Sequence, residues 1–343
     1  MKQLLNTLYI TMPETYLACS GNDIVVMLDQ KCIAKLPMQN FESVVTFSYS
    51  GMSPSLMQKC LDAGIAVAFM SNSGHLKGRL VGKQIGNVYL RQGQYQIAND
   101  QSSSLKIAKN FILGKVYNQR WIIERFLRDH PLQIDVERFR TISQRLKKGL
   151  DDIQSSMSID ELRGIEGRLA TDYYSIFDDM IINQKDDFYY HGRNRRPPLD
   201  RVNSLLSLAY SLLRVECASA LAANGLDTYI GFMHVDRPGR ESLALDLMEE
   251  LRGVVADRFV LRLINKQMVH ANDFIQKADG ATIMTDEARK RFLTGWQKNK
   301  MVELNHPYLK EKIEWGLVPF AQAQLLARCI RGDTDGYAPF LWK

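Results

Sequence analysis

The pattern of apolar and polar positions changes near residue 100. Before it, short apolar runs alternate with turn residues, which is typical of β-strands. Two such runs, 16–19 and 24–28, flank the sequence Ser-Gly-Asn-Asp and predict a hairpin. A Ser-Pro pair predicts the start of a short helix over 53–61. We expect the other strands of this part at 32–36, 44–47 and 65–70.

The segment 92–104 is polar and contains consecutive serines, so it is the predicted domain boundary. Helical periodicity follows it, beginning at Ile107 and running past Phe126. We expect further helices over 138–154, 158–183, 200–223, 242–270, 285–300 and 306–331. The predicted fold is therefore a two-domain α+β protein. A small N-terminal β-rich domain takes residues 1–100, and a larger all-α domain takes residues 101–343.

Composition places the chain among ordinary globular proteins. Of its 343 residues, 45% are hydrophobic and 24% charged, which excludes disorder as the main state. The five cysteines form no Cys-x-x-Cys pair, so we expect reduced thiols in a cytoplasmic protein. Because no run of 18 apolar residues occurs, we expect no membrane span. The net charge of +6 is compatible with a nucleic-acid partner but does not establish one.

Several common catalytic motifs are absent from the sequence. There is no Gly-x-Gly-x-x-Gly, no His-Glu-x-x-His and no Gly-x-Ser-x-Gly. Nucleotide-dependent enzymes, zinc proteases and serine hydrolases therefore lose most of their support.

The block 231–252 carries the most informative chemistry. It predicts a turn followed by a helix on which Asp246 and Glu249, three residues apart, project from one face. Glu250 lies about 100° away and is expected to be solvated or paired. His234 precedes the turn and can fold back over the acidic face. One imidazole and two carboxylates suit Mn²⁺ or Mg²⁺. A polar helix face beside a core histidine explains the same pattern equally well.

A second candidate is Glu166, which lies between Gly164 and Gly167 in a predicted helix. Each glycine costs about 1 kcal/mol inside a helix, so something should compensate. Close approach of another backbone, a metal or a phosphate would do so, which makes Glu166 a candidate third carboxylate. The alternative is an exposed glutamate whose glycines allow tight helix packing.

Basic residues gather near these pieces of sequence, although any one of them alone is more often a solvated helix surface. Carboxylates for a metal, surrounded by Arg and Lys, suit phosphodiester chemistry. The predicted DNA-binding residues are Arg163, Arg193, Arg195, Arg196, Arg237, Arg240 and Lys115.

At these residues the sequence resembles a known family over nearly its whole length. The family is the CRISPR-associated endonuclease and integrase of spacer acquisition, the first-numbered Cas protein. The most specific piece is the block from His234 to Arg252. Supporting pieces are the run Arg163-Gly164-Ile165-Glu166-Gly167, Lys109-Asn110 with Gly114-Lys115 and Asn118-Gln119-Arg120, Arg196-Pro197-Pro198 with Asp200 and Asn203, and Asn272-Asp273-Phe274.

The resemblance implies a β-domain that dimerises and a helical catalytic domain. It implies that Glu166, His234 and Glu249 bind Mg²⁺ or Mn²⁺, with Asp246 as a catalytic acidic residue beside them. Family members often carry Asp where this chain has Glu249. Whether Asp246 or Glu249 is the tighter ligand therefore stays open at this point.

The resemblance also implies the reaction and the partners. A DNA 3′-hydroxyl attacks a phosphodiester at the CRISPR repeat boundary, and the DNA is double-stranded, branched or a protospacer with 3′ overhangs. The protein is expected to be a homodimer, and the small second-numbered Cas protein bridges two dimers. Within the family, the sequence most resembles the type I-C branch, in which an iron–sulfur Cas nuclease also associates.

Two other function classes remain open from the residues alone. A branched-DNA repair nuclease would share the site but need no partner protein. A non-enzymatic DNA-binding scaffold would need no divalent ion.

Overall fold

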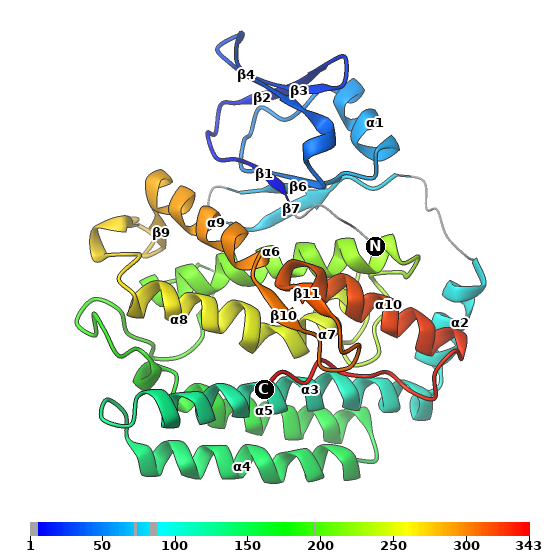
Figure 1. Ribbon diagram of the computed structural model, residues 1–343, viewed down its shortest axis with the longest axis vertical. Coiled ribbons are helices and arrows are strands. Elements are labelled where there is room, and N and C mark those ends of the chain that lie inside the picture. The colour runs from blue at the N-terminus through cyan, green and yellow to red at the C-terminus, as the bar shows by residue number, and fades with distance from the viewer. Residues whose placement is uncertain (1–5, 72–73, 83–87, 195–196) are drawn as a thin grey trace.

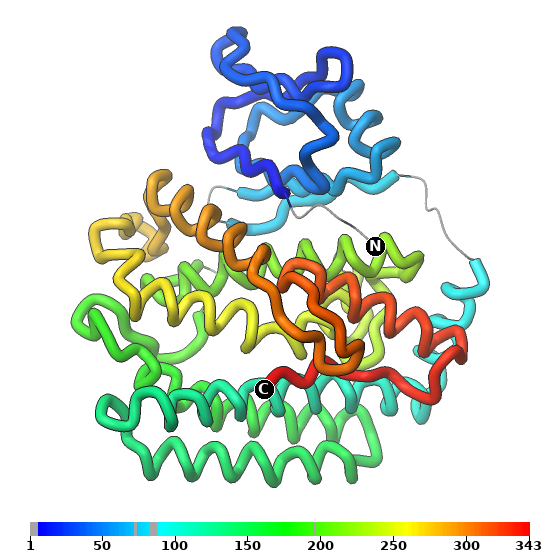
Figure 2. Tube along the Cα trace, viewed as in Figure 1, coloured from blue at the N-terminus to red at the C-terminus, as the bar shows by residue number. Residues whose placement is uncertain are grey.

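A computed structural model describes residues 6–71, 74–82, 88–194 and 197–343 of the chain. A β-rich N-terminal region lies at one end, above a larger and mostly helical region (Figures 1 and 2). This arrangement confirms the predicted α+β class. Arg195 and Arg196 fall outside the described residues.

The N-terminal region contains two sheets and one helix. A four-stranded sheet has the order β1-β5-β6-β7, with β1, β5 and β6 parallel and β7 antiparallel to β6. Its strands are β1 (Thr7–Ile10), β5 (Ser43–Thr46), β6 (Ala66–Met70) and β7 (Leu76–Arg79). The second sheet is the antiparallel meander β2 (Tyr16–Ser20), β3 (Asp23–Leu28) and β4 (Lys31–Pro37). The predicted hairpin is thus confirmed as β2–β3, and the predicted short helix as α1 (Pro54–Asp62).

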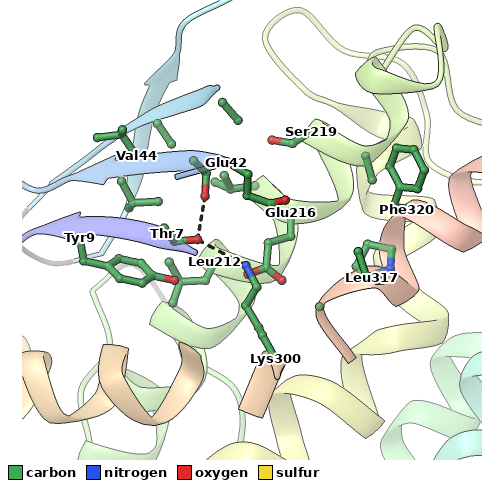
Figure 3. A pocket seen from close by; sticks show the side chains of 18 residues that line it. Thr7, Tyr9, Glu42, Val44, Leu212, Glu216, Ser219, Lys300, Leu317 and Phe320 are labelled. Atoms are coloured by element: carbon green, nitrogen blue, oxygen red, sulfur yellow. Dashed lines mark hydrogen bonds and ion pairs between the residues drawn. The ribbon is translucent and has the colours of Figure 1, made fainter. Parts of the chain in front are cut away.

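The four-stranded sheet is buried on both faces. Because side chains alternate along a strand, Val44 and Val67 face the core of the N-terminal region, whereas Val45 and Ala68 join the core of the helical region. A small cavity lies at this junction (Figure 3), where the buried Lys300 ammonium lies 3.3 Å from a Glu216 carboxylate oxygen. The sheet therefore docks on the helices through both apolar packing and a buried ion pair.

The helical region is built from helices joined by connections of very different lengths, from the short loop between α4 and α5 to the long one between α5 and α6. Helices α3, α4 and α5 lie side by side, and α7 and α10 pack on the central helix α6 (Figure 1). The helices are α2 (Val88–Asn99), α3 (Gln101–Asp129), α4 (Val136–Ser155), α5 (Ile159–Ser175), α6 (Arg201–Ala223), α7 (Ser242–Leu251), α8 (Arg258–Asn265), α9 (Asp286–Lys300) and α10 (Val318–Arg331). A π-helical segment, Arg252–Asp257, joins α7 to α8.

Helix α6 is long and apolar enough to cross a membrane, with a mean hydropathy of 1.4 over its most apolar window. However, 67% of that window is buried inside the protein, and α7 and α10 cover it. It is the core helix of this region.

Several predicted elements differ from the structure. The polar segment 92–104 is helical rather than a linker, because Asp100 caps α3 by accepting a hydrogen bond from the Ser103 N–H (2.7 Å). The region called all-α also contains two hairpins, and one of them replaces the start of the helix predicted over 306–331. These hairpins pair β8 (Phe274–Gln276) with β9 (Thr282–Met284) and β10 (Glu303–Asn305) with β11 (Lys312–Glu314). Strands of three residues are too short to produce a period in the sequence.

Candidate active site

Three helices and one loop bring the predicted site residues together. Helix α3 supplies Lys115 and helix α5 supplies Glu166. Helix α7 supplies Asp246 and Glu249, and His234 lies in the loop that precedes it. Because α3 packs against both α5 and α7, it lies between the two sources of carboxylates.

Lys115 occupies the centre of this arrangement. Its side chain is only 3% exposed, so it is not a solvated surface lysine as a helical pattern alone would indicate. Its ammonium donates to the Glu166 carboxylate and lies 2.7 Å from Oε2 of Glu249. Two carboxylates from different helices therefore share one buried cation.

Glu249 is held as a carboxylate by its neighbours. Burial alone would raise its pKa, but the Arg252 guanidinium, then Lys115 and His234, lower the pKa to about 2. Arg252 lies 2.8 Å from the second oxygen of the same carboxylate. Glu249 is thus ionised at neutral pH, which is the form in which a carboxylate binds a metal ion.

Asp246 is engaged by the histidine loop. It is fully buried and accepts hydrogen bonds from the backbone N–H groups of Phe232 (2.6 Å), Met233 (3.0 Å) and His234 (3.0 Å). Its Oδ1 also lies 2.6 Å from Nδ1 of the His234 imidazole. The loop therefore does fold back over the acidic helix face. Nδ1 is bound to Asp246, which leaves Nε2 for another partner.

Gly231 makes this close approach possible. A Cβ at that position would lie 2.8 Å from Oδ2 of Asp246 and 2.9 Å from Cβ of Ser242. By contrast, a Cβ at Gly164 or Gly167 would meet nothing within 4 Å. Of the three groups expected to compensate the two helix glycines, a closely packed backbone is therefore not found in the described structure, whereas a metal or a phosphate stays a prediction.

Glu250 points away from the site and into the protein. It is fully buried, and it accepts hydrogen bonds from Nε2 of Gln322 (3.0 Å), from the Phe340 N–H (2.8 Å) and from the Tyr337 hydroxyl. Burial raises its pKa to about 7, although these hydrogen bonds lower it in part. It is paired, as one of the two expectations had it. Its partners are Gln322 on α10 and Tyr337 and Phe340 in the C-terminal tail, which no sequence signal indicates.

The predicted DNA-binding arginines fall into different environments. Arg163 donates to the backbone carbonyl of Met233 (3.2 Å), so it fastens the histidine loop to α5. Arg193 donates to Asn203 (2.7 Å) and Ser207 (3.0 Å) on α6 and is half-buried. Arg237 is exposed and Arg240 is half-buried, both on the loop just after His234.

The side chains that meet here are of the types that bind a hard divalent cation. Two carboxylates converge on one cation, and a histidine with an orienting carboxylate lies beside them. In the part of the chain that the structure describes, His, Cys, Asp and Glu do not gather three at a time in a metal-ligand cluster. The cation between the two glutamates is the Lys115 ammonium.

Comparison with known proteins identifies a family. The family model for CRISPR associated protein Cas1 matches residues 8–298. CRISPR-associated endonuclease Cas1 1 of Chlorobaculum tepidum is 41% identical over 343 residues, covering all of both chains. CRISPR-associated endonuclease Cas1 2 of Rhodospirillum rubrum is 43% identical over 347 residues, again covering both chains. A Cas4 exonuclease/Cas1 endonuclease fusion of Geobacter sulfurreducens is 34% identical, over 97% of this chain and 60% of the fusion.

Solved structures share the fold. A casposase bound to its integration product has a TM-score of 0.83 at 22% identity, covering 98% of this chain and 94% of the casposase. A Cas1 protein of Thermotoga maritima has a TM-score of 0.80 at 21% identity, covering 95% and 97% of the two chains. A chain of a Cas6-RT-Cas1–Cas2 complex has a TM-score of 0.83 at 21% identity, covering all of this chain and 36% of that one.

Proposed function

Since the chain belongs to the Cas1 family of CRISPR-associated endonucleases, the integrases of spacer acquisition, we propose that its DNA chemistry occurs where α3, α5 and α7 meet. The single observation that carries this proposal is the convergence of Glu166 and Glu249 on one buried ammonium, beside a histidine oriented by Asp246. Family membership leaves the non-enzymatic scaffold without support.

We assign Glu166, His234 and Glu249 as the residues that hold a divalent ion. Carboxylate oxygens suit Mg²⁺ and Mn²⁺, and an imidazole shifts the preference toward Mn²⁺. The ion, when bound, supplies Lewis-acid polarisation of the phosphodiester and charge neutralisation in the transition state. The lowered pKa of Glu249 keeps it in its ligand form at neutral pH.

Asp246 is a positioning residue in this proposal. Its two oxygens already accept three backbone N–H groups and face Nδ1 of His234. A carboxylate engaged in this way fixes the tautomer and the orientation of the imidazole, which presents Nε2 to the site. Of the two acidic residues on α7, Glu249 is therefore the proposed ligand.

Lys115 has two roles in the proposed site. Its ammonium lies between the Glu166 and Glu249 carboxylates in this structure. When a divalent ion takes that position, the displaced ammonium can donate to an oxygen of the scissile phosphate, which is the DNA contact predicted for Lys115. Its charge also offsets the repulsion between the two carboxylates.

The DNA backbone is expected to lie along the histidine loop. Arg237 is exposed at the turn of this loop, and Arg163 holds its base to α5. Arg240 follows the turn, and Arg195 and Arg196 stay predictions from the sequence. We propose branched or 3′-overhang double-stranded DNA as the substrate. The casposase bound to an integration product, which shares this fold, supports this choice.

We propose the partners from the same comparisons. A Cas1–Cas2 complex among the similar structures supports association with the small second-numbered Cas protein, Cas2. The Cas4–Cas1 fusion supports association with the iron–sulfur nuclease Cas4. Homodimerisation through the β-rich region and a cytoplasmic location complete the proposal.

Cleavage and strand transfer on branched DNA test the site. We compare wild type with His234→Ala and with the control His191→Ala, which changes an exposed histidine in another loop, in Mn²⁺, Mg²⁺ and EDTA. Wild type and the control should be active only with a divalent ion, and His234→Ala should lose roughly 100-fold or more in rate. Activity that persists in EDTA, or in His234→Ala, would contradict the metal site.

A further inference from the structure

A second cavity lies between the C-terminal end of α3 and helix α8. Its polar lining includes His130 from the end of α3, and Arg258, Arg262 and Lys266 from α8 and its C-cap. None of the residues that line it in the described structure is an aspartate or glutamate. The cavity is therefore strongly positive on one side, while Phe126 and other apolar side chains form the rest of its wall.

The arginines at this cavity have no acidic partners. Among the described residues, no carboxylate forms an ion pair with Arg258, Arg262 or the neighbouring Arg125. Arg262 donates to the amide oxygen of Asn299 (3.0 Å). The guanidinium carbons of Arg258 and Arg125 lie 4.1 Å and 3.8 Å from the ring centroid of Trp342.

Such an arrangement is costly for an apo protein. Burial, and then the nearby charges of Arg125 and Arg262, lower the pKa of Arg258 to about 10. Burial also lowers the pKa of Arg262. Partly desolvated cations that lack a counter-charge favour an anion, and arginine matches the oxygens of a phosphate with two parallel hydrogen bonds.

We propose that this cavity is a phosphate-binding site for DNA, separate from the metal site. Phe126, which lines the cavity, lies eleven residues beyond Lys115 on α3, which corresponds to about 17 Å along the helix axis. A strand held at the metal site could thus be gripped a second time at this distance. Phe126 offers an apolar surface to the sugar or base next to the bound phosphate. The DNA source rests on the proposed function, whereas the affinity for phosphate does not.

The test measures binding without a metal, so it does not depend on catalysis. Fluorescence anisotropy of a labelled oligothymidine is recorded in EDTA over a range of salt concentrations. The variant is the double change Arg262→Gln with Lys266→Gln. The matched control is Arg140→Gln with Lys147→Gln, which removes the same charge from exposed positions on α4.

We expect the Kd of the cavity variant to rise about tenfold. The slope of log K against log salt should become shallower by about one to one and a half, because two phosphate contacts are lost. The control variant should change the Kd and the slope only by the small amount that follows from its lower net charge. A cavity variant with the Kd and slope of the control would overturn the proposal.

Two further arms keep the result interpretable. Lys266→Glu reverses one exposed charge at the cavity, so it should fold normally and weaken binding even if the double variant does not fold. Pyrophosphate is added as a competitor to distinguish the source of the phosphate. Displacement of the oligonucleotide from wild type but not from Lys266→Glu would show that free phosphate groups bind. If the cavity variants weaken strand binding but pyrophosphate does not displace the strand from wild type, the site binds phosphates only as part of a strand.

Failure of this inference can be told apart from failure of the proposed function. The cavity variant and its matched control are compared in EDTA, so their binding does not depend on a loaded metal site, and His234 does not line this cavity. Loss of strand transfer with intact cavity-dependent binding would concern the metal site alone.

Discussion

The sharpest prediction about this site concerns Lys115, whose ammonium lies between the two carboxylates that we propose as metal ligands. Lys115→Met keeps the length and volume of the side chain and removes its charge. In wild type the ammonium is 3% exposed and pairs with Glu166 and Glu249. Removing one partner of a buried ion pair costs about 3–5 kcal/mol. Because Glu166 is 22% exposed and Arg252 still pairs with Glu249, we expect the lower end, about 3 kcal/mol.

Manganese should restore much of this loss. A ligand at 100 times its Kd stabilises the folded state by about 2.7 kcal/mol. In wild type, Mn²⁺ has to displace the ammonium from the carboxylates, whereas in Lys115→Met it meets two carboxylates without a shared cation. The gain in stability on adding Mn²⁺ should therefore be larger for the variant. Strand transfer should still fall, since the proton offered to the phosphate is gone.

Urea denaturation in EDTA and in Mn²⁺ measures both effects. Lys106→Met is the control, because Lys106 is exposed on the same helix. We expect it to match wild type in both buffers. If Lys115→Met is as stable as Lys106→Met in EDTA and gains no more from Mn²⁺ than wild type, Lys115 does not balance the carboxylates and this reasoning fails.

Three further predictions concern residues around the site. Asp246→Asn should lower Mn²⁺ affinity about 10–100-fold by releasing the His234 imidazole, and titration followed by electron paramagnetic resonance checks this. Gly231→Ala should cost about 1–3 kcal/mol, because its Cβ would lie 2.8 Å from Oδ2 of Asp246; Gly167→Ala, whose Cβ meets nothing, should be neutral or stabilising in the same urea assay. Burial raises the pKa of Asp257 from 3.8 to about 6, so the folded state holds the proton more tightly than the unfolded state. This shift should contribute a fall in stability of up to about 3 kcal/mol between pH 4 and 6, in addition to the fall that Glu250 contributes in the same direction, and Asp257→Asn should make the slope shallower by its share; an unchanged slope would contradict the shift.

Local patterns explain which parts of the site could be predicted. Asp246 and Glu249 follow from helix spacing alone, and His234 lies close to them in sequence. The Lys115 contact spans 51 residues to Glu166, and nothing in a helical pattern distinguishes a buried lysine from a solvated one. The same limit applies to Glu250, whose partner Phe340 lies 90 residues away.

Residues 164–167 show a different limit. Two glycines in a helix indicated the approach of a backbone, a metal or a phosphate, and in the described structure a Cβ at either glycine would meet nothing within 4 Å. A Cβ is absent there although no neighbour in the described structure requires its absence. Sequence indicated an unusual helix but could not show whether protein or open space lay beside it.

Adjacent residues on α7 show how position alone sets the chemistry of a carboxylate. Glu249 and Glu250 have the same side chain and are both buried, yet their pKa values are about 2 and about 7. Helix geometry turns them about 100° apart, so one meets Lys115 and Arg252 and the other meets neutral donors of α10 and the C-terminal tail. The charged one lies at the site, and the other fastens α7 to the core through the Phe340 N–H. The C-terminal tail thereby fixes the helix on which the proposed metal ligand lies. Two adjacent residues of α7 thus have different roles, since Glu249 is the proposed ligand and Glu250 anchors the helix.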